Sequence, residues 1–448
     1  MVERTPGRRV RDTFTEFFQL EAASGIVLIA CVVVALLWAN LFPQPYADFW
    51  HTPIGISFGS FELKLSLQHW INDGLMAIFF LVVGLEIKRE LLVGELSDRQ
   101  KSALPIAAAI GGMVVPAAIY AVLNIGSPNL RGWGVPMATD IAFSLGILAL
   151  AGSRVPIALK VFLTALAIVD DLGAVLVIAL FYSNNLNFAM LGYAGICFAL
   201  LMAVNLSRMR APILYGVFGF ALWLCMVQSG IHASISGVII ALAIPARIRL
   251  EKPQFLKRLT QEVTLLERDF SRSVDANLTD DEQEHVRVIE KSCRDIQMPV
   301  ERVKHALHEF QSYFIVPVFA LANAGVPLSA PAFQGIGSSV SLGVILGLLV
   351  GKPLGIFVAC KIAVGTGLGK LHSEVSWRQI FGASVLAGIG FTMSIFIAEL
   401  AFGQGETLVQ AKLAILIASA VAAVAGFGLL RPATRLRAGN RMTTSEES

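Results

Sequence analysis

The sequence predicts an all-α polytopic membrane protein, and its composition supplies the first reason. Only 15% of the 448 residues are charged, whereas a soluble domain carries about a quarter. Hydrophobic residues make up 55% of the chain, and the mean hydropathy is +0.69. The second reason is that apolar residues form long runs, close to the roughly 20 residues that a helix needs to cross a bilayer. The net charge of +3 is small, so nucleic-acid binding is not expected.

Windows of that length give about twelve candidate spans. They lie near residues 23–40, 69–87, 104–124, 134–150, 157–181, 188–206, 211–227, 230–246, 312–328, 339–360, 379–402 and 410–430. The chain then divides into an N-terminal segment 1–22, eight spans in 23–246, a charged segment 247–309, four spans in 310–431 and a tail 432–448.

The segments between these spans differ in positive charge. Lys and Arg gather in the N-terminal segment, in every second loop, in the charged segment and in the tail. The other loops contain only Lys64 and Arg131, while Lys412 is placed to snorkel from a helix end. Because cytoplasmic loops are enriched in Lys and Arg, both termini are predicted to be cytoplasmic.

Residues 53–67, in the first external loop, have a different period. Apolar residues alternate with Gly, Ser, Glu and Lys on both sides of Gly59-Ser60. Such alternation around a turn is typical of a β-hairpin. An isolated hairpin is marginally stable in water, so we expect it to pair with something, for instance a second copy of the protein. An ordinary packed loop is the alternative.

The charged segment contains a second departure from the membrane pattern, at residues 251–300. Apolar residues recur there at heptad-like spacing, in the runs Leu256, Leu259, Val263, Leu266, Phe270 and Val286, Ile289, Cys293, Ile296. The spacing predicts a cytoplasmic helical hairpin with an apolar seam. Thr279 and Glu282 are placed to form a capping box for its second helix. A solvated, partly disordered loop is the alternative.

Four ionisable residues lie deep within the predicted spans. Asp140 is in the fourth span, Asp170 and Asp171 are near the middle of the fifth, and Lys352 is in the tenth. Ionisable groups at this depth are costly and usually functional. Neighbouring helical residues point about 100° apart, so one aspartate is expected to line an ion cavity while the other pairs with Lys352. The alternative is a structural role, with Lys352 neutralising Asp140 and nearby helix ends.

These residue types suit the exchange of a proton for a metal cation. Carboxylates and backbone carbonyls are hard oxygen ligands, as sodium requires. Desolvation and a neighbouring carboxylate both disfavour the anionic form of a buried aspartate, so such a site binds either a proton or a cation. Exchange then needs only this competition and alternating exposure of the site to the two sides of the membrane.

Two of the spans contain helix-breaking residues. Residues 387–391 are Ala-Gly-Ile-Gly-Phe, and residues 132–136 are Gly-Trp-Gly-Val-Pro, shortly before Thr139 and Asp140. Interrupted spans in the two halves of a transporter indicate broken helices around a mid-membrane site. The broken ends carry opposite half-dipoles, which Asp140 and Lys352 are placed to balance.

Six ordered motifs resemble those of the NhaA sodium/proton antiporters. They are Ile71-Asn72-Asp73-Gly74-Leu75-Met76-Ala77, Gly84-Leu85-Glu86-Ile87-Lys88-Arg89-Glu90-Leu91, Ala138-Thr139-Asp140-Ile141-Ala142-Phe143, Val169-Asp170-Asp171-Leu172-Gly173-Ala174, Gly351-Lys352-Pro353-Leu354-Gly355 and Gly388-Ile389-Gly390-Phe391-Thr392-Met393-Ser394-Ile395-Phe396. The resemblance extends from about residue 14 to 431, apart from the 251–300 insert. NhaA is itself one of the known examples of the broken-helix pattern, so the pattern and the resemblance are not independent.

The resemblance implies a twelve-helix fold of inverted repeats, with two interrupted crossing helices, in the bacterial inner membrane. The implied activity is electrogenic export of Na⁺ or Li⁺ in exchange for entering H⁺. At the matching positions, Asp171 would be the principal ion ligand and Asp170 its partner in Na⁺ and proton handling. Thr139, Asp140 and Lys352 would support the site. A homodimer contact through the external hairpin is also implied, and no cofactor is predicted.

The resemblance also implies activation by alkaline pH. The candidate pH-sensing residues are Glu86, Arg89, Glu90, His232, Lys304, His305 and His308. The family has a glutamate where Lys304 stands, so the acidic partner is lost or displaced, for instance to Glu301. The alternative is that these residues simply solvate helix ends.

Two other functions are compatible with charged residues in a membrane. An intramembrane aspartyl protease also uses mid-span aspartates, and such enzymes resemble one another in a Gly-x-Gly-Asp motif. Here Asp170 follows Val169, and Gly388-Ile389-Gly390 is followed by Phe391. A passive sodium channel would show sodium flux without obligatory proton movement.

Overall fold

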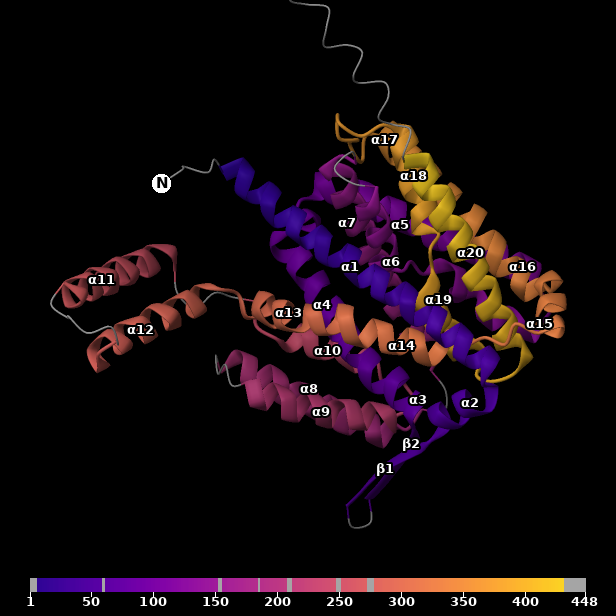
Figure 1. The fold of residues 1–448 in the computed structure, drawn as a ribbon, viewed down its shortest axis with the longest axis horizontal. Coiled ribbons are helices and arrows are strands. Elements are labelled where there is room, and N and C mark those ends of the chain that lie inside the picture. The colour runs from indigo at the N-terminus through magenta and orange to yellow at the C-terminus, as the bar shows by residue number, and fades with distance from the viewer. Residues whose placement is uncertain are drawn as a thin grey trace, which may run out of the picture.

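The computed structural model describes residues 6–58, 61–151, 155–183, 186–207, 212–246, 251–271 and 278–430. Helices make up almost all of it (Figure 1). The first half contains α1 (Pro6–Leu41), α2 (Pro43–His51), β1 (Pro53–Phe58), β2 (Phe61–Ser66), α3 (Leu67–His69), η1 (Trp70–Leu75), α4 (Met76–Val93), η2 (Glu95–Ser97), α5 (Arg99–Leu123), η3 (Pro128–Met137), α6 (Ile141–Leu150), α7 (Ile157–Phe181) and α8 (Phe188–Leu206).

The second half follows the same all-helical pattern. It contains α9 (Pro212–Val227), α10 (Ile235–Ala243), α11 (Lys252–Phe270), α12 (Asp280–Ile296), α13 (Pro299–Phe310), η5 (Gln311–Ile315), α14 (Val316–Asn323), α15 (Ala330–Gln334), η6 (Gly335–Gly337), α16 (Ser339–Leu346), η7 (Gly347–Gly351), α17 (Lys352–Gly365), α18 (Trp377–Ala387), α19 (Phe391–Phe402) and α20 (Glu406–Leu430).

Membrane-length helices account for most of the predicted spans. Within the described residues, eight helices are long and apolar enough to cross a membrane, and a ninth span is formed if the bent pair α18 and α19 is counted as one. The all-α polytopic fold class is therefore confirmed, whereas the total of twelve spans stays a prediction.

Three predicted spans differ from the helices found at their positions. The predicted span 211–227 corresponds to α9, which has 16 residues, and the predicted span 230–246 contains α10, which has only nine. The predicted span 312–328 starts too late, because α13, η5 and α14 follow one another without interruption from Pro299. A hydropathy window detects apolar residues and therefore misses the charged first turns of such a helix.

Close contacts between glycines bring the central helices together. α5 packs along α17, and a side chain at Gly111 or at Gly355 would meet the backbone of the other helix. α10 packs along α4, where a side chain at Gly237 would meet the backbone of Ala77. Small residues at such positions allow the close approach that drives helix association in a membrane. The contact with α5 fixes the position of Lys352 at the start of α17.

Three π-helical turns interrupt the regular hydrogen bonding of the apolar helices. η1 contains Asn72 and Asp73, η5 begins just after His308, and η7 immediately precedes Lys352. Single π-turns inside α-helices occur frequently at functional sites. Each of the three lies next to a polar residue that bears on the site described below.

Strands β1 and β2 pair antiparallel, from Pro53 opposite Ser66 to Phe58 opposite Phe61, at the position predicted for the hairpin. Figure 1 shows them extending from the bundle beyond α2 and α3. The indole Nε1 of Trp70 donates to the carbonyl oxygen of Ile54 at 3.1 Å, which ties the strands to the start of the second span, Leu67–Val93.

Helices α11 and α12 pack against each other and project from the bundle (Figure 1). The capping box of Thr279 and Glu282 is present, as predicted. The predicted apolar seam holds only in part: Leu256, Val263, Phe270 and Val286 are exposed, whereas the other predicted seam residues are half-buried, namely Leu259, Leu266, Ile289, Cys293 and Ile296. The contact face of α11 is rotated relative to that prediction, since His285 of α12 faces acidic residues of α11 there.

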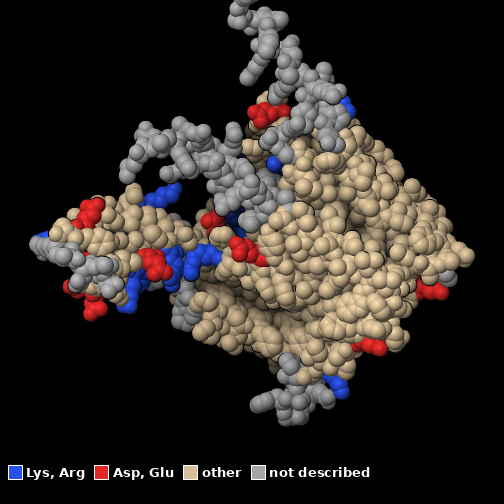
Figure 2. Space-filling view, viewed as in Figure 1, with Lys and Arg blue, Asp and Glu red and all other residues tan. Residues whose placement is uncertain are grey.

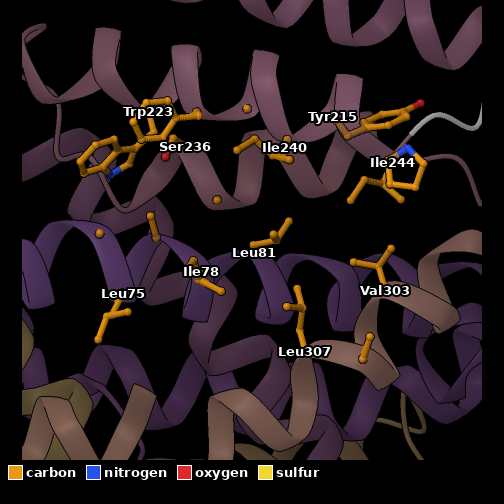
Figure 3. A pocket seen from close by; sticks show the side chains of 18 of the residues that line it. Leu75, Ile78, Leu81, Tyr215, Trp223, Ser236, Ile240, Ile244, Val303 and Leu307 are labelled. Carbon is orange, nitrogen blue, oxygen red and sulfur yellow. The ribbon is translucent and has the colours of Figure 1, made fainter. Parts of the chain in front are cut away.

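Charged side chains gather over this insert and near the ends of the bundle, while the visible helix surface between them is nearly free of charge (Figure 2). A cavity of about 1610 Å³ lies beside the insert, between η1, α4, α9, α10 and α13. Its walls are mainly apolar, as Leu75, Ile78, Trp223, Ile240 and Leu307 illustrate (Figure 3). None of the four ionisable residues deep within the spans lines this cavity.

Candidate functional site

Two broken helices cross in the centre of the bundle. Between η3 and α6 the chain is extended, and between α18 and α19 it bends by 44°. We call these two breaks, residues 138–140 and 388–390, the crossing. The backbone N–H of Asp140 donates to the carbonyl oxygen of Ile389 at 2.7 Å. A side chain at Gly388 would lie 2.6 Å from the carbonyl oxygen of Leu348, so glycine is required there.

The carboxylate of Asp140 lies at the N-termini of both helices that leave the crossing. It accepts the backbone N–H of Phe143 in α6 at 2.9 Å, and that of Thr392 in α19 at 3.1 Å. It also accepts the Thr392 hydroxyl at 2.6 Å. A negative charge there satisfies orphan N–H groups and opposes the positive ends of two helix dipoles. The geometry is the half-dipole balance that the sequence predicts for Asp140.

Lys352 and Asp170 form a fully buried ion pair beside the crossing. The Lys352 Nζ lies 2.6 Å from Asp170 Oδ2, and it also donates to the carbonyl oxygen of Met137, the last residue of η3. The Thr139 hydroxyl lies 2.5 Å from the same Asp170 oxygen and 3.0 Å from the carbonyl oxygen of Ala387. Lys352 in α17 therefore connects to α7 through Asp170, and to the C-terminal, negative end of η3 through the Met137 carbonyl.

Asp171 points elsewhere, as the rotation between neighbouring helical residues requires. Its side chain is buried, and neither carboxylate oxygen has a hydrogen-bond partner within the described part of the chain. It lines a cavity of about 50 Å³ together with Asp140 and Thr392. A volume of this size accommodates a small cation or a few water molecules. The two aspartates are thus separated into one paired carboxylate and one that faces a cavity.

The cavity extends from the crossing toward α13. Its other lining residues include Glu86 of α4, His308 of α13 and Gln311 of η5. Of the candidate pH-sensing residues, Glu86 and His308 thus share a cavity with Asp171. His305 is exposed on α13 and does not line it.

Ion pairs surround the α13 end of the cavity. Lys304 lies 2.5 Å from Glu86, and Arg89 contacts Glu301 at 3.1 Å and Glu90 at 2.6 Å. We call these five residues the entrance cluster. Glu301 supplies a negative charge next to α4, one turn before Lys304.

His232 lies away from the cavity, between α9 and α10. Its Nε2 is 3.4 Å from a carboxylate oxygen of Asp73, and its Nδ1 is 2.8 Å from the Ser234 hydroxyl. Its ring meets that of Phe396 edge-on, with centroids 5.2 Å apart. The structure therefore places His232 near η1 and not near the entrance cluster.

A further buried polar group was not singled out by the sequence. Glu399 in α19 lies 2.7 Å from Lys412 in α20, and both side chains are about nine-tenths buried. Lys412 thus has an acidic partner inside the bundle and does not snorkel to the surface, which corrects the prediction. The sequence contained a signal for this pair, because Glu399 is a carboxylate within the apolar predicted span 379–402. The signal was missed because its partner, Lys412, lies on another helix.

Paired and unpaired carboxylates at a crossing of interrupted helices, inside a bundle of membrane-length helices, define a secondary ion transporter. The chain matches the family described as Na⁺/H⁺ antiporter 1 over residues 15–430. It is 48% identical to the Na⁺/H⁺ antiporter NhaA of Oleidesulfovibrio alaskensis, over 95% of this chain and 94% of the relative. It is 45% identical to NhaA 1 of Saccharophagus degradans, over 94% and 91%, and 43% identical to NhaA of Christiangramia forsetii, over 94% of each.

The chain therefore belongs to the Na⁺/H⁺ antiporter 1 family and is a multi-pass membrane protein. Members of this family are sodium/proton antiporters and not enzymes, so the family match excludes an intramembrane protease and a passive sodium channel.

Proposed function

We propose that this chain exports Na⁺, and also Li⁺, from a bacterial cytoplasm in exchange for entering protons, with Asp171 as the principal ion ligand. The observation that carries the proposal is the buried Asp171 carboxylate, which faces the cavity without a hydrogen-bond partner among the described residues. An unpaired buried carboxylate is costly as an anion. A bound proton or a bound cation removes that cost, and the two compete for the same oxygens.

The pair of Asp170 and Lys352 gives this competition a second charge. The second carboxylate oxygen of Asp170, Oδ1, has no hydrogen-bond partner within the described residues, and Asp170 directly precedes Asp171 in the chain. If Asp170 turns toward an ion held by Asp171, Lys352 loses its partner, and an uncompensated ammonium at this depth is costly. The Lys352 ammonium then releases a proton, in addition to the proton released by Asp171. One cation would replace more than one proton, which makes the exchange electrogenic.

Access to the site is proposed to be from the cytoplasm in this conformation. The cavity runs from Asp171 toward the entrance cluster on α4 and α13, and the distribution of Lys and Arg predicts that side to be cytoplasmic. Both termini and the α11–α12 insert would then also be cytoplasmic, in the inner membrane. The entrance cluster is proposed to set the pH response, because its charges border the ion path.

A homodimer is proposed to form through the β1–β2 hairpin, which extends from the bundle as a two-stranded sheet with unpaired edges. Deletion of residues 54–65 should convert a cross-linked dimer into a monomer. A dimer that survives the deletion would show that another surface is used.

Everted membrane vesicles with an imposed proton gradient test the proposed site. Added sodium should collapse the gradient in the wild type and should have no effect in the Asp171→Asn variant. Asp48→Asn, which removes a carboxylate from the external helix α2, is the matched control and should behave as the wild type. Intact exchange in Asp171→Asn would refute the assignment of Asp171.

A further inference from the structure

Two helices, α19 and α14, show the same order of residues on the side of the crossing away from the entrance cluster. In α19, Thr392 lines the cavity, Phe396 follows one turn later, and Glu399 lies one further turn along. In α14, Val316 lines the cavity, Phe319 follows three residues later, and Asn323 lies four residues further along, so both helices cover seven residues. Seven helical residues correspond to about 10 Å. Two layers therefore cover the site from that side.

The first layer is aromatic. The ring centroid of Phe396 lies 5.7 Å from that of Phe80 and 6.1 Å from that of Phe319, and all three side chains are fully buried. We call Phe80, Phe319 and Phe396 the aromatic layer. A packed apolar layer excludes water and ions, so it separates the cavity from the residues beyond it.

The second layer is polar and joins four parts of the chain. We call Gln68, Asn72, Asn323, Glu399 and Lys412 the Glu399 cluster. The Asn72 amide donates to Glu399, and the Asn323 amide donates to Asn72 Oδ1 at 2.8 Å. The Gln68 amide donates to Asn323 Oδ1 at 2.9 Å, and Lys412 donates to Glu399 at 2.7 Å. Glu399 thus connects α3 and η1 with α14 and α20.

We propose that Glu399 is a positioning residue whose contacts hold the transporter closed on the side away from the entrance cluster. We call these contacts the latch. They must break before the ion site can open to that side. This inference rests on the proposed alternating exchange at Asp171. The latch keeps the aromatic layer closed while the site faces the entrance cluster. Its release frees η1 and α14 to move apart from α19 and α20.

Three features favour a latch over a permanent brace. The Glu399 and Lys412 side chains retain 11% and 10% exposure, so water can replace each partner when the contacts open. By contrast, the Lys352–Asp170 pair has exposures of 0% and 1%. Three of the five members are carboxamides, which both donate and accept and therefore exchange partners without leaving a group unsatisfied. One of the linked segments, η1, is a π-turn, a common site of local rearrangement.

Sodium kinetics and hydrogen exchange of Glu399→Gln in proteoliposomes test the latch. Loss of the charge should shift molecules toward the state open on the Glu399 side, and a fall of the cavity-open population to one fifth raises the apparent sodium KM on the entrance side about fivefold. Peptides covering residues 67–78 and 316–323 should exchange faster. The charge-swapped double variant Glu399→Lys/Lys412→Glu should return KM to within about twofold of the wild type.

Asn124→Ala is the matched control, because the Asn124 amide also bridges two helices, from α5 to Ser339 in α16 at 3.1 Å. It should lower the thermal stability without changing KM. The latch is wrong if Glu399→Gln behaves in the same way, with unchanged KM and unchanged hydrogen exchange at 67–78 and 316–323. If Glu399→Gln does not fold, the shorter acid in Glu399→Asp is measured in its place. Absent exchange in the wild type would instead defeat the proposed function, and the hydrogen-exchange comparison would still decide the latch.

Discussion

An acid–base pair lies beside the crossing, and others form the entrance cluster, but only the entrance cluster is reached by solvent. Lys352 and Asp170 have side-chain exposures of 0% and 1%. Arg89 and Glu301 have exposures of 37% and 46%. Removing one partner of a buried pair leaves a charge that nothing solvates, whereas exposed pairs contribute only about 0–1 kcal/mol. Removal of one partner should therefore cost more stability at the buried Lys352–Asp170 pair than at the exposed Arg89–Glu301 pair.

This difference suits the proposed function, in which the buried charges take part in the exchange and the entrance cluster sets the pH response. At the crossing, the Asp140 carboxylate accepts backbone N–H groups from the ends of two helices. Beside it, Lys352 donates to the Asp170 carboxylate and to the carbonyl oxygen of Met137. Each substitution there disturbs several elements at once. In the entrance cluster, Lys304 pairs with Glu86 and Glu301 pairs with Arg89, so each pair joins one residue of α13 to one residue of α4.

The largest expected effect is that of Lys352→Met. It removes the partner of Asp170 and should lower the free energy of unfolding by about 3 kcal/mol, because a buried carboxylate is left unpaired. Thermal unfolding in detergent measures the loss. The double variant Asp170→Asn/Lys352→Met removes both charges and should recover most of it. A double variant less stable than Lys352→Met would show that the pair is not what stabilises this region.

Asp140→Ala should have the second-largest effect on stability. It uncaps α6 and α19 together, and with about 1 kcal/mol for each cap the expected loss is about 2 kcal/mol. Asp140→Asn keeps an oxygen that can accept from Phe143 and Thr392, and it should lose less than half as much. Equal losses for the two variants in the same unfolding assay would contradict the capping role.

Lys304→Glu should alter regulation and leave stability nearly unchanged. It replaces the ammonium that now contacts Glu86 at 2.5 Å with a second carboxylate, and neighbouring like charges favour proton uptake at the entrance. The pH profile of sodium-driven exchange should move to higher pH by less than about one unit, given the partial exposure of the pair. The swap Glu86→Lys/Lys304→Glu should restore it. Coinciding profiles of wild type and Lys304→Glu would remove this position from pH sensing.

The smallest expected effect is in the insert, where His285 joins α12 to α11. Its Nδ1 lies 2.7 Å from Glu262 and its Nε2 lies 3.5 Å from Asp269. The hydrogen bond with Glu262, followed by the charges of Glu262, Asp269 and Asp281, raises the pKa of His285 above its ordinary value of 6.5. The stabilisation is then complete below pH 6.5 and is lost as the pH rises through the raised pKa.

Hydrogen exchange of residues 252–296 as a function of pH checks this expectation. His285→Gln should weaken protection in acid and approach the wild type in alkali, while His372→Gln, outside the insert, should leave protection unchanged. A difference between His285→Gln and the wild type that grows with rising pH would have the wrong sign and would exclude His285 as the linking group.

The parts of the fold set by local sequence could be predicted, and those set by packing could not. The predicted spans 157–181 and 188–206 coincide with α7 and α8, because each is a continuous apolar run with clear ends. The nine-residue α10 could not be distinguished from a full span, since its length depends on how it fits against α4. The seam of the insert was predicted only in part, because the contacts of His285 with Glu262 and Asp269 lie between the two helices beside the apolar residues.

The site divides in the same way. The different directions of Asp170 and Asp171 follow from helix geometry alone, and the structure has them. The Glu399–Lys412 pair depends on two helices meeting, and from the sequence Lys412 was interpreted as a snorkelling side chain while Glu399 was not singled out. Pairs that form only through tertiary contact leave no spacing signal in a single sequence.

Sodium binding to the purified protein as a function of pH tests the central claim most directly. If a proton and Na⁺ compete for Asp171, the apparent dissociation constant for Na⁺ should rise at least about tenfold for each pH unit lowered in the acidic range, and about a hundredfold where Lys352 also releases its proton. Sodium addition should release protons into a weakly buffered solution. Asp171→Asn should show neither effect. A dissociation constant that stays constant with pH, without proton release, would contradict the account.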